Sequence, residues 1–423
     1  MKENFLHYVW QYKLFNTLNL KLTSGETLQI LHSGLSNKNS GPDFFNAKAI
    51  IDEILWYGHV EIHVKSSDWY QHKHEEDKNY DAVILHVVYE HDVDIYMKGN
   101  KQIPTLELKE FIDNSIVEKY ASIFQQQTNW ISCEKEIHTI NSFIYQNFTE
   151  RLYLERLESK SKFIFTLLEN TNYDFEAVLF QLLVKNFGLK VNGDSFLKLA
   201  TSFDFSLIRK IGANEFQLSA LLFGQAGFLN EIEESEYQNV LKKEYEYLKH
   251  KYQLNSLGKN EFQFFRMRPN NFPTIRLAQI ATLYSSYRSL FSKLIHLDNV
   301  GDFYEILSTG VNEFWEEHYT FLKSSKKNKK QLTKSFIDLL LINTILPLKF
   351  VYLKHRDEFD ETNFFKLLES IQPEKNTIIQ KFESLKISSK NALESQALLQ
   401  LKTNYCNHKK CLECAIGNFL LSK

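Results

Sequence analysis

The hydrophobic pattern of this chain changes once, near residue 110, and that change limits the folds open to it. Before this point, apolar residues alternate with polar ones in runs such as "ILWYGHVEIHV" and "AVILHVVYE", which is the pattern of β-strands. After it, apolar residues recur every three or four positions, as in "FEAVLFQLLVKNFGL", which is typical of helices. The pattern predicts an α+β protein, with a mixed-sheet domain over residues 1–112 and a larger all-helical region over residues 113–423.

Within the first domain the order of elements is predicted to be α-β-β-β-α-β-β. We expect a helix, a hairpin, three longer strands separated by a turn and a short helix or loop, and a last short strand. In chain order these are Glu3–Phe15, "TSGET", the strand after Pro42, the turn at Asp52–Glu53, "ILWYGHVEIHV", the segment from Asp68, "AVILHVVYE" and "IPTLEL".

Composition and charge narrow the classes of function. The 423 residues are 14% aromatic and include 6 prolines, which is typical of a fully folded chain. The net charge of −2 excludes a uniformly basic nucleic-acid binder, so any contact with nucleic acid must come from local patches. We find neither a secretory signal nor the ~18 uninterrupted apolar residues of a membrane span, and so expect a cytoplasmic protein with no membrane partner. These features do not determine the oligomeric state.

The segment "HVEIHVK" has the pattern of a strand with one chemically reactive face. Side chains at alternate positions share a face of a strand, and here they are His59, Glu61, His63 and Lys65. Opposite Asp43 on the preceding strand, this face would anchor Mg2+ or Mn2+ and leave sites for water and phosphate. We predict Asp43 and Glu61 as metal ligands in a catalytic site. His63 and Lys65 are predicted to orient water or phosphate there.

Strand register decides whether Asp43 can join this face. If the hairpin turn consists of Asp52–Glu53 alone, regular pairing places Asp43 opposite Ile62, with its side chain on the other face from Glu61. The predicted site therefore requires a three-residue turn, a β-bulge, or a kink at Pro42.

Further histidines follow this strand. His72 and His74 are spaced to bind a transition metal, although a solvated loop has the same composition. His86 lies in an apolar strand, where a hydrogen-bonded core histidine is commoner than a ligand. A metal enzyme of another class, using His63 and these three, would require three of the imidazoles to converge on one point.

Three of the four cysteines crowd into the C-terminal pattern C-x(4)-C-x(2)-C. They are Cys406, Cys411 and Cys414, and either Cys133 or His408 could complete a set of four ligands. Four thiolates would suit zinc or an iron–sulfur cluster. Reduced, buried cysteines without a metal are the alternative. If a metal is bound, we expect its role to be structural.

Two basic segments lie in the helical region. In "FRMRPNNFPTIRLAQ", Arg266, Arg268 and Arg276 surround the start of a helix, where they could bind substrate phosphate or tie an ordered loop to its neighbours. The tract Lys323–Lys334 is either a solvated loop or a contact to a phosphate backbone. Nucleic acid is therefore a candidate partner.

The N-terminal part resembles the PD-(D/E)XK nuclease superfamily. That family places an Asp near the start of one core strand and an acidic-x-Lys triplet on the next, within an α-β-β-β-α-β core. Here Pro42–Asp43 and Glu61–His63 match these elements, with His63 in place of the usual Lys. The resemblance implies a restriction-endonuclease-like fold and a metal-dependent nuclease. A non-catalytic nucleic-acid-binding or scaffold protein is the alternative.

A second resemblance covers nearly the whole chain. Together with the strand motifs, "LFGQAGFL", "RMRPNNFPTIRLAQ", "WEEHY", "SQALLQLK" and the terminal cysteine pattern are similar to a bacterial domain-of-unknown-function family, number 2851. This resemblance implies relatives but no activity.

Overall fold

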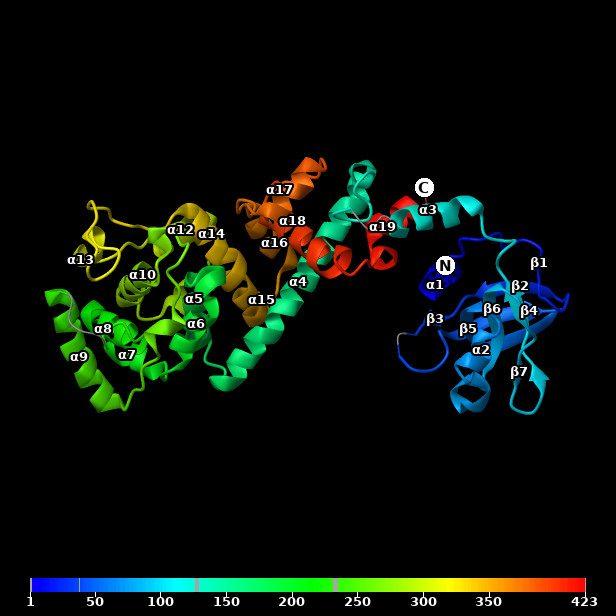
Figure 1. The fold of residues 1–423 in the computed structure, drawn as a ribbon, viewed down its shortest axis with the longest axis horizontal. Coiled ribbons are helices and arrows are strands. Elements are labelled where there is room, and N and C mark those ends of the chain that lie inside the picture. Colours follow the sequence, from blue (N-terminus) through cyan, green and yellow to red (C-terminus); the bar gives the residue numbers. More distant parts are fainter. Residues whose placement is uncertain (1, 38, 126–128, 231–234, 423) are drawn as a thin grey trace. The chain divides into compact units, whose positions relative to one another are not determined.

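The computed structural model of the chain divides into two compact units. It describes residues 2–37, 39–125, 129–230 and 235–422. We call Met1–Phe148 with Leu401–Lys423 the sheet unit and Thr149–Gln400 the helical unit. The sequence pattern placed one boundary near residue 112, whereas the sheet unit extends beyond that point and includes the C-terminal cysteines. Figure 1 shows α19 (Ala415–Ser422), at the red end of the chain, beside α3 (Asn114–Gln125).

A mixed sheet forms the centre of the sheet unit (Figure 1). Its strands are β1 (Leu20–Lys21), β2 (Thr27–His32), β3 (Leu35–Ser36), β4 (Phe44–Ile51), β5 (Ile54–Lys65), β6 (Val83–Glu90) and β9 (Thr105–Glu107). The order is β1-β2-β4-β5-β6-β9, with β3 paired to β4. The strands β2, β4 and β5 form an antiparallel meander, whereas β6 runs parallel to both β5 and β9. A separate hairpin pairs β7 (Tyr96–Met97) with β8 (Lys101–Gln102). The predicted mixed sheet is confirmed.

A β-bulge in β4 sets the register between β4 and β5. Ala47 pairs with Gly58, but Phe44 pairs with Val60, so β4 carries one more residue than β5 over this interval. Asn46 lies in the bulge with a left-handed φ of 58°. Asparagine adopts this conformation more readily than most residues because its short polar side chain hydrogen-bonds locally.

The bulge reverses the consequence of the short turn. Ile51 pairs with Ile54, so the turn has only two residues, and regular pairing would place Asp43 opposite Ile62. The extra residue in β4 moves Asp43 by one position, so that it lies opposite Glu61. The sequence pattern required a longer turn, a bulge or a kink, and the structure uses the bulge.

Parallel pairing of β5 with β6 requires a crossover between them. The crossover consists of α2 (Asp68–Gln71) and two short 3-10 helices, His74–Glu76 and Lys78–Tyr80. Its first residues are held by Asp92, which accepts hydrogen bonds from the hydroxyls of Ser66 (2.9 Å) and Ser67 (2.7 Å). The crossover therefore leaves the end of β5 in a fixed direction.

The remaining elements of the sheet unit are mostly helical. They are α1 (Glu3–Gln11), α3, the first residues of α4 (Ser142–Asn170), a 3-10 helix at Ile137–Thr139, a π turn at Leu401–Cys406, a 3-10 helix at Cys411–Glu413, and α19. Helix α1 buries Phe5, Leu6 and Val9 and packs beside β5. It ends at Gln11, four residues earlier than its apolar stripe predicted.

The helical unit follows the predicted three- and four-residue periodicity. Its helices after α4 are α5 (Phe175–Phe187), α6 (Leu189–Thr201), α7 (Ser206–Ile211), α8 (Glu215–Gln225), α9 (Glu236–Tyr252), α10 (Pro273–Ser286), α11 (Leu290–Leu294), α12 (Val300–Leu307), α13 (Glu313–Glu317), α14 (Lys334–Leu340), α15 (Leu346–His355), α16 (Glu361–Glu369), α17 (Thr377–Ser384) and α18 (Ala392–Gln400). Short 3-10 helices lie at Lys259–Glu261 and Pro269–Asn271, and a π turn at Leu341–Ile345 joins α14 to α15. Polar side chains cap several N-termini, including Asp174, Asn214 and Asn376.

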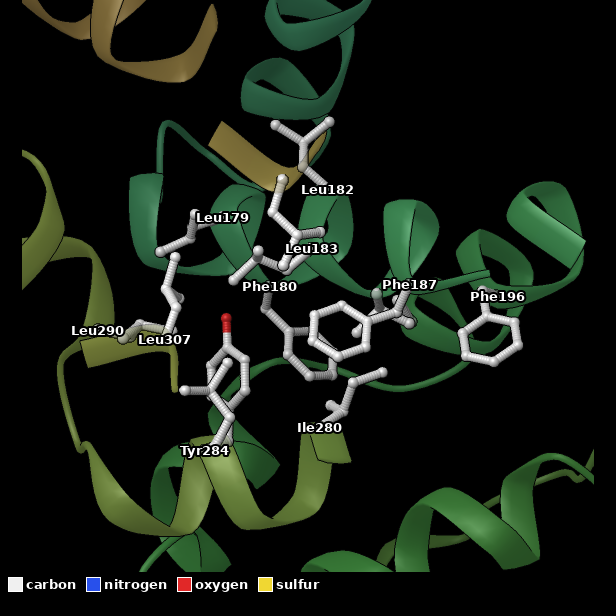
Figure 2. Close-up of a cluster of buried hydrophobic side chains, with 14 of the residues drawn as sticks. Leu179, Phe180, Leu182, Leu183, Phe187, Phe196, Ile280, Tyr284, Leu290 and Leu307 are labelled. Carbon is white, nitrogen blue, oxygen red and sulfur yellow. The ribbon is translucent and has the colours of Figure 1, made fainter. Parts of the chain in front are cut away.

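The core of the helical unit centres on α5. Figure 2 shows Phe180, Leu183 and Phe187 of α5 facing Ile280 and Tyr284 of α10. The rings of Phe180 and Tyr284 meet edge to face with centroids 5.0 Å apart. Burial of such large side chains is the main stabilising contribution in a helical bundle.

One helical segment, Lys334–His355, is long and apolar enough to cross a membrane by length and composition alone. Its most apolar window has a mean hydropathy of 1.8, and 78% of that window is buried inside the protein. A buried core helix has the same properties.

Candidate functional site: a histidine and carboxylate cluster

Glu61 and His63 lie on one face of β5, as the alternation of the strand predicted. Both faces are covered at this point, because Glu61 is 4% and His63 1% exposed on this face, and Ile62 is 0% exposed on the other. The Nε2 atom of His63 lies 3.7 Å from Oε1 of Glu61. A buried carboxylate next to a buried imidazole is costly unless each has a polar partner, so the surrounding groups decide what the pair can do.

Asp43 joins this pair through the main chain. Its backbone N–H donates a hydrogen bond to Oε2 of Glu61 at 3.0 Å, and its own Oδ2 accepts one from the N–H of Ile62 at 3.0 Å. These two bonds bring both carboxylates to the junction of β4 and β5, and they depend on the register that the bulge sets.

The crossover after β5 brings two more histidines to the same point. Nδ1 of His72 lies 3.1 Å from Nε2 of His63, and Nε2 of His74 lies 3.2 Å from Oε1 of Glu61. One ring nitrogen each from His63, His72 and His74 lies within 4.8 Å of the other two, a spacing that could hold a metal ion. Nitrogen ligands around a tetrahedral ion stand about 3.3 Å apart, and the His63–His72 separation of 3.1 Å is close to that value.

His86 and two aromatic rings fix the orientation of these imidazoles. Nε2 of the fully buried His86 lies 2.8 Å from Nδ1 of His63, which leaves Nε2 of His63 facing the cluster. Tyr80 stacks on His74 with ring centroids 3.9 Å apart, and Trp69 packs edge-on against both His74 and His86. His86 is therefore hydrogen-bonded in the core, as the apolar strand around it predicted, and it orients a neighbour in the cluster.

Burial controls the protonation of the cluster. Burial, and then the negative charge of Asp43, raise the pKa of Glu61 to about 9. Burial, and then the adjacent imidazoles, lower the pKa of His63 to about 2, and burial lowers that of His86 to about 3. Neutral imidazoles with free lone pairs are the form that binds metal, and a cation would also favour the ionised form of Glu61.

The structure adds one residue that the sequence did not single out. His7 of α1 places Nε2 3.2 Å from Oδ2 of Asp43. Burial alone would lower the pKa of His7, but the hydrogen bond and charge of Asp43 outweigh it, so the pKa is raised. His7 belongs to no motif, and only the packing of α1 beside β5 brings it here.

The other predicted site residues lie elsewhere. Lys65 is exposed at the end of β5, and its side chain forms no hydrogen bond or ion pair with the described residues. In the helical unit, Arg266 is exposed and lies over the ring of Phe265. Arg268 and Arg276 line a cavity in the same unit.

The four cysteines converge, although Cys133 is far from the others in sequence. Cys133, Cys406, Cys411 and Cys414 line one cavity of about 20 Å³ in the sheet unit, and none forms a disulfide. Burial, and then the neighbouring thiols Cys414 and Cys411, raise the pKa of Cys133 to about 12. His408 is exposed and does not line this cavity. Of the two candidates for a fourth ligand, Cys133 is the one that the structure brings to the C-terminal cysteines.

Fold and cluster together define a mixed α+β protein with a buried set of histidines and carboxylates that could hold a metal ion. The chain belongs to the family described as protein of unknown function DUF2851, whose model matches residues 3–377. No curated protein and no solved structure matches it.

Proposed function

We propose that the sheet unit is a metal-dependent nuclease that hydrolyses phosphodiester bonds. The observation that carries this proposal is the convergence of three imidazoles with Glu61 and Asp43 at the junction of β4 and β5. The proposed substrate, nucleic acid, rests on the resemblance of Asp43 and Glu61-x-His63 to the nuclease motif. The order of α1, the meander β2-β4-β5, the crossover and β6 supports a restriction-endonuclease-like fold.

The donor set favours a transition metal. Mg2+ prefers oxygen ligands, whereas imidazole is a common ligand of zinc and related ions. Of the two ions expected from the sequence, Mn2+ therefore suits the cluster better than Mg2+, and Zn2+ joins it as a candidate. Glu61, His63, His72 and His74 would hold the ion, which would lower the pKa of a water molecule and polarise a phosphoryl oxygen.

The chain itself would contribute orientation and proton transfer. His86 holds His63 with Nε2 toward the cluster, and Asp43 holds Glu61 through its N–H. The side chains of His7 and Asp43 remain 28% and 20% exposed, so this pair can reach solvent. His7 would accept or return a proton at its other ring nitrogen, because Nε2 faces Asp43, which stabilises the charged form of the ring.

An assay on the purified full chain tests the proposal. Labelled single- and double-stranded DNA and RNA are incubated with Mn2+, Mg2+ or Zn2+. Cleavage is expected with Mn2+ or Zn2+, and Glu61→Gln and His74→Gln should each lower the rate at least about 100-fold because each removes a metal ligand.

His138→Asn is the matched control, because His138 is an exposed histidine of the same unit and lies outside the cluster. It should retain full activity, and circular dichroism should show that all variants are folded. Absence of cleavage by the wild type, or cleavage that both ligand variants retain, would sink the nuclease proposal.

A second candidate is a metal enzyme of another class. The three histidines meet the geometric condition for it, since they converge at one point. This function predicts that the wild type binds Mn2+ or Zn2+ in a cluster-dependent manner but leaves all nucleic acids intact. Hydrolysis of small phosphate and carboxylate esters by the same preparation would then support it.

We also propose that the four cysteines hold one structural metal centre. All four line one small cavity, and none forms a disulfide. Four thiolates would suit zinc or an iron–sulfur cluster. The volume of the cavity, about 20 Å³, gives room for one ion and so favours zinc. Free thiols persist in the cytoplasm, which we propose as the compartment.

A further inference from the structure

The helical unit contains a cavity of about 980 Å³ with an excess of positive charge. Its size lies at the upper end of the range for small-molecule sites. The cationic side chains that line it are Arg268, Arg276, Lys330, Lys334 and Lys375, whereas Asp338 and Glu374 are the carboxylates among its lining residues. Such an imbalance makes the cavity attractive to anions.

Arg276 is the buried centre of this charge. Its side chain is 5% exposed. It donates hydrogen bonds to Oδ1 of Asn271 (2.7 Å) and Oε1 of Gln279 (2.8 Å), and it stacks on the ring of Phe336 at 3.7 Å. These three neutral groups orient the guanidinium, while Nε has no hydrogen-bond partner. The charge is held in place but is not neutralised.

The two carboxylates of the cavity are engaged with neutral groups. Asp338 accepts a hydrogen bond from the hydroxyl of Tyr304 at 2.6 Å. Glu374 accepts hydrogen bonds from the side-chain amides of Gln396 (2.6 Å) and Asn376 (3.0 Å). Neither forms an ion pair with Arg276, and no other carboxylate of the described residues does so. A buried arginine without a counter-ion is expensive, so an anion from outside would relieve that cost.

A second buried cationic residue lines the same cavity. Lys330 is 4% exposed, and its ammonium group donates to the carbonyls of Trp315, Glu316 and His318. The side-chain amide of Gln279, which orients Arg276, donates to the carbonyl of Lys330 at 2.7 Å. Arg276 and Lys330 therefore form one connected, rigid base to the cavity.

We propose that this cavity binds a small molecule that carries phosphate groups, of about the size of a nucleotide. The planar guanidinium of Arg276 matches the oxygens of a phosphate, and the exposed Arg268 and Lys334 would hold further negative charge at the rim. A site on a buried arginine inside a cavity suits a small anion better than a polymer. The proposal is independent of the nuclease activity and concerns a different unit.

Calorimetric titration of the full chain with inorganic pyrophosphate and with ATP tests the proposal. At least one probe should bind with a dissociation constant below about 1 mM. Arg268→Ala and Lys334→Ala should each weaken binding about tenfold without altering the fold, because both side chains are exposed. Arg276→Met should abolish binding. It should also raise the melting temperature of the ligand-free protein by about 2–4 °C, because it removes a buried, unneutralised charge.

Arg266→Ala is the control, because Arg266 is an exposed arginine of the same loop that does not line the cavity. Its affinity for the probe should equal that of the wild type. The proposal is overturned if neither probe binds, if Arg266→Ala weakens binding as much as Arg268→Ala, or if Arg276→Met lowers the melting temperature and retains binding. Competition by a single-stranded oligonucleotide, with the same dependence on Arg276, would overturn the assignment to a small molecule.

Discussion

At the scale of the residue, burial decides which ionisable side chains are charged. Glu61 is buried beside a second carboxylate, which raises its pKa and favours its protonated form, so a bound cation would favour the ionised form. Arg276 is buried without a carboxylate partner, so a bound anion would stabilise its charge. Lys160 differs, because its ammonium group donates to Oδ1 of Asn343 (2.9 Å) and the carbonyl of Ile342 (3.3 Å). Burial, and then the neighbouring Arg156, lower the pKa of Lys160 to about 7.

The lowered pKa of Lys160 predicts a pH dependence of stability. Between about pH 7 and pH 10 the unfolded chain retains the lysine proton that the folded chain has lost, so the free energy of unfolding should rise with pH. Below pH 7 both states bind the proton, and the full cost of the buried charge remains. Lys160→Met should remove this rise and stabilise the protein at pH 6 by on the order of 1–2 kcal/mol.

Urea unfolding of both proteins from pH 6 to pH 9.5 measures this difference. Lys162→Met provides the control, because Lys162 is an exposed lysine of the same helix. If the free energy of unfolding changed with pH equally in the wild type and in Lys160→Met, the result would contradict the lowered pKa of Lys160.

At the scale of the element, the bulge in β4 is the feature on which the candidate site depends. It brings Asp43 opposite Glu61. Within the bulge, Nδ1 of His59 accepts a hydrogen bond from the N–H of Asn46 at 3.3 Å. Alternation along β5 was enough to predict that Glu61 and His63 share a face. The sequence offered a bulge as one of three ways to align Asp43 but could not select or place it, because a left-handed asparagine has no distinct pattern in a strand.

Substitution of Asn46 tests the role of the bulge. Asn46→Val should destabilise the sheet unit by about 1–2 kcal/mol, because a β-branched residue disfavours the left-handed conformation. It should also weaken binding of Mn2+ or Zn2+, since Asp43 would move away from Glu61. Asn46→Gly, which adopts that conformation freely, should keep both properties near the wild type. Equal effects of the two variants on metal affinity would show that the bulge does not position the site.

At the scale of the whole molecule, the C-terminal segment is part of the sheet unit and not of the helical unit that precedes it. The convergence of Cys133 with Cys406, Cys411 and Cys414 accounts for this arrangement if a metal joins them. A link between segments more than 250 residues apart in sequence would restrict the unfolded chain as well as hold the folded one.

Metal analysis of protein purified without oxygen tests the cysteine centre. We expect one zinc ion or one iron–sulfur cluster per chain, distinguished by zinc, iron and sulfide content and by visible absorption. Cys133→Ser should lose the metal and increase hydrogen exchange in α19, while the helices of the helical unit stay protected. His408→Asn should retain the metal, because His408 lies outside the cavity. Less than stoichiometric zinc and iron in the wild type would contradict the proposal.

The sequence by itself determined the α+β class, the succession of strands and helices, and the shared face of Glu61 and His63, because all three follow from local periodicity. It also marked His72, His74 and the cysteines as groups with ligand chemistry. Only the tertiary structure decided which of these groups meet. The crossover brings His72 and His74 to β5, the packing of α1 adds His7, the bulge aligns Asp43, and the return of the C-terminus unites the cysteines. Such contacts join residues that are distant in sequence, so the local hydrophobic pattern cannot predict them.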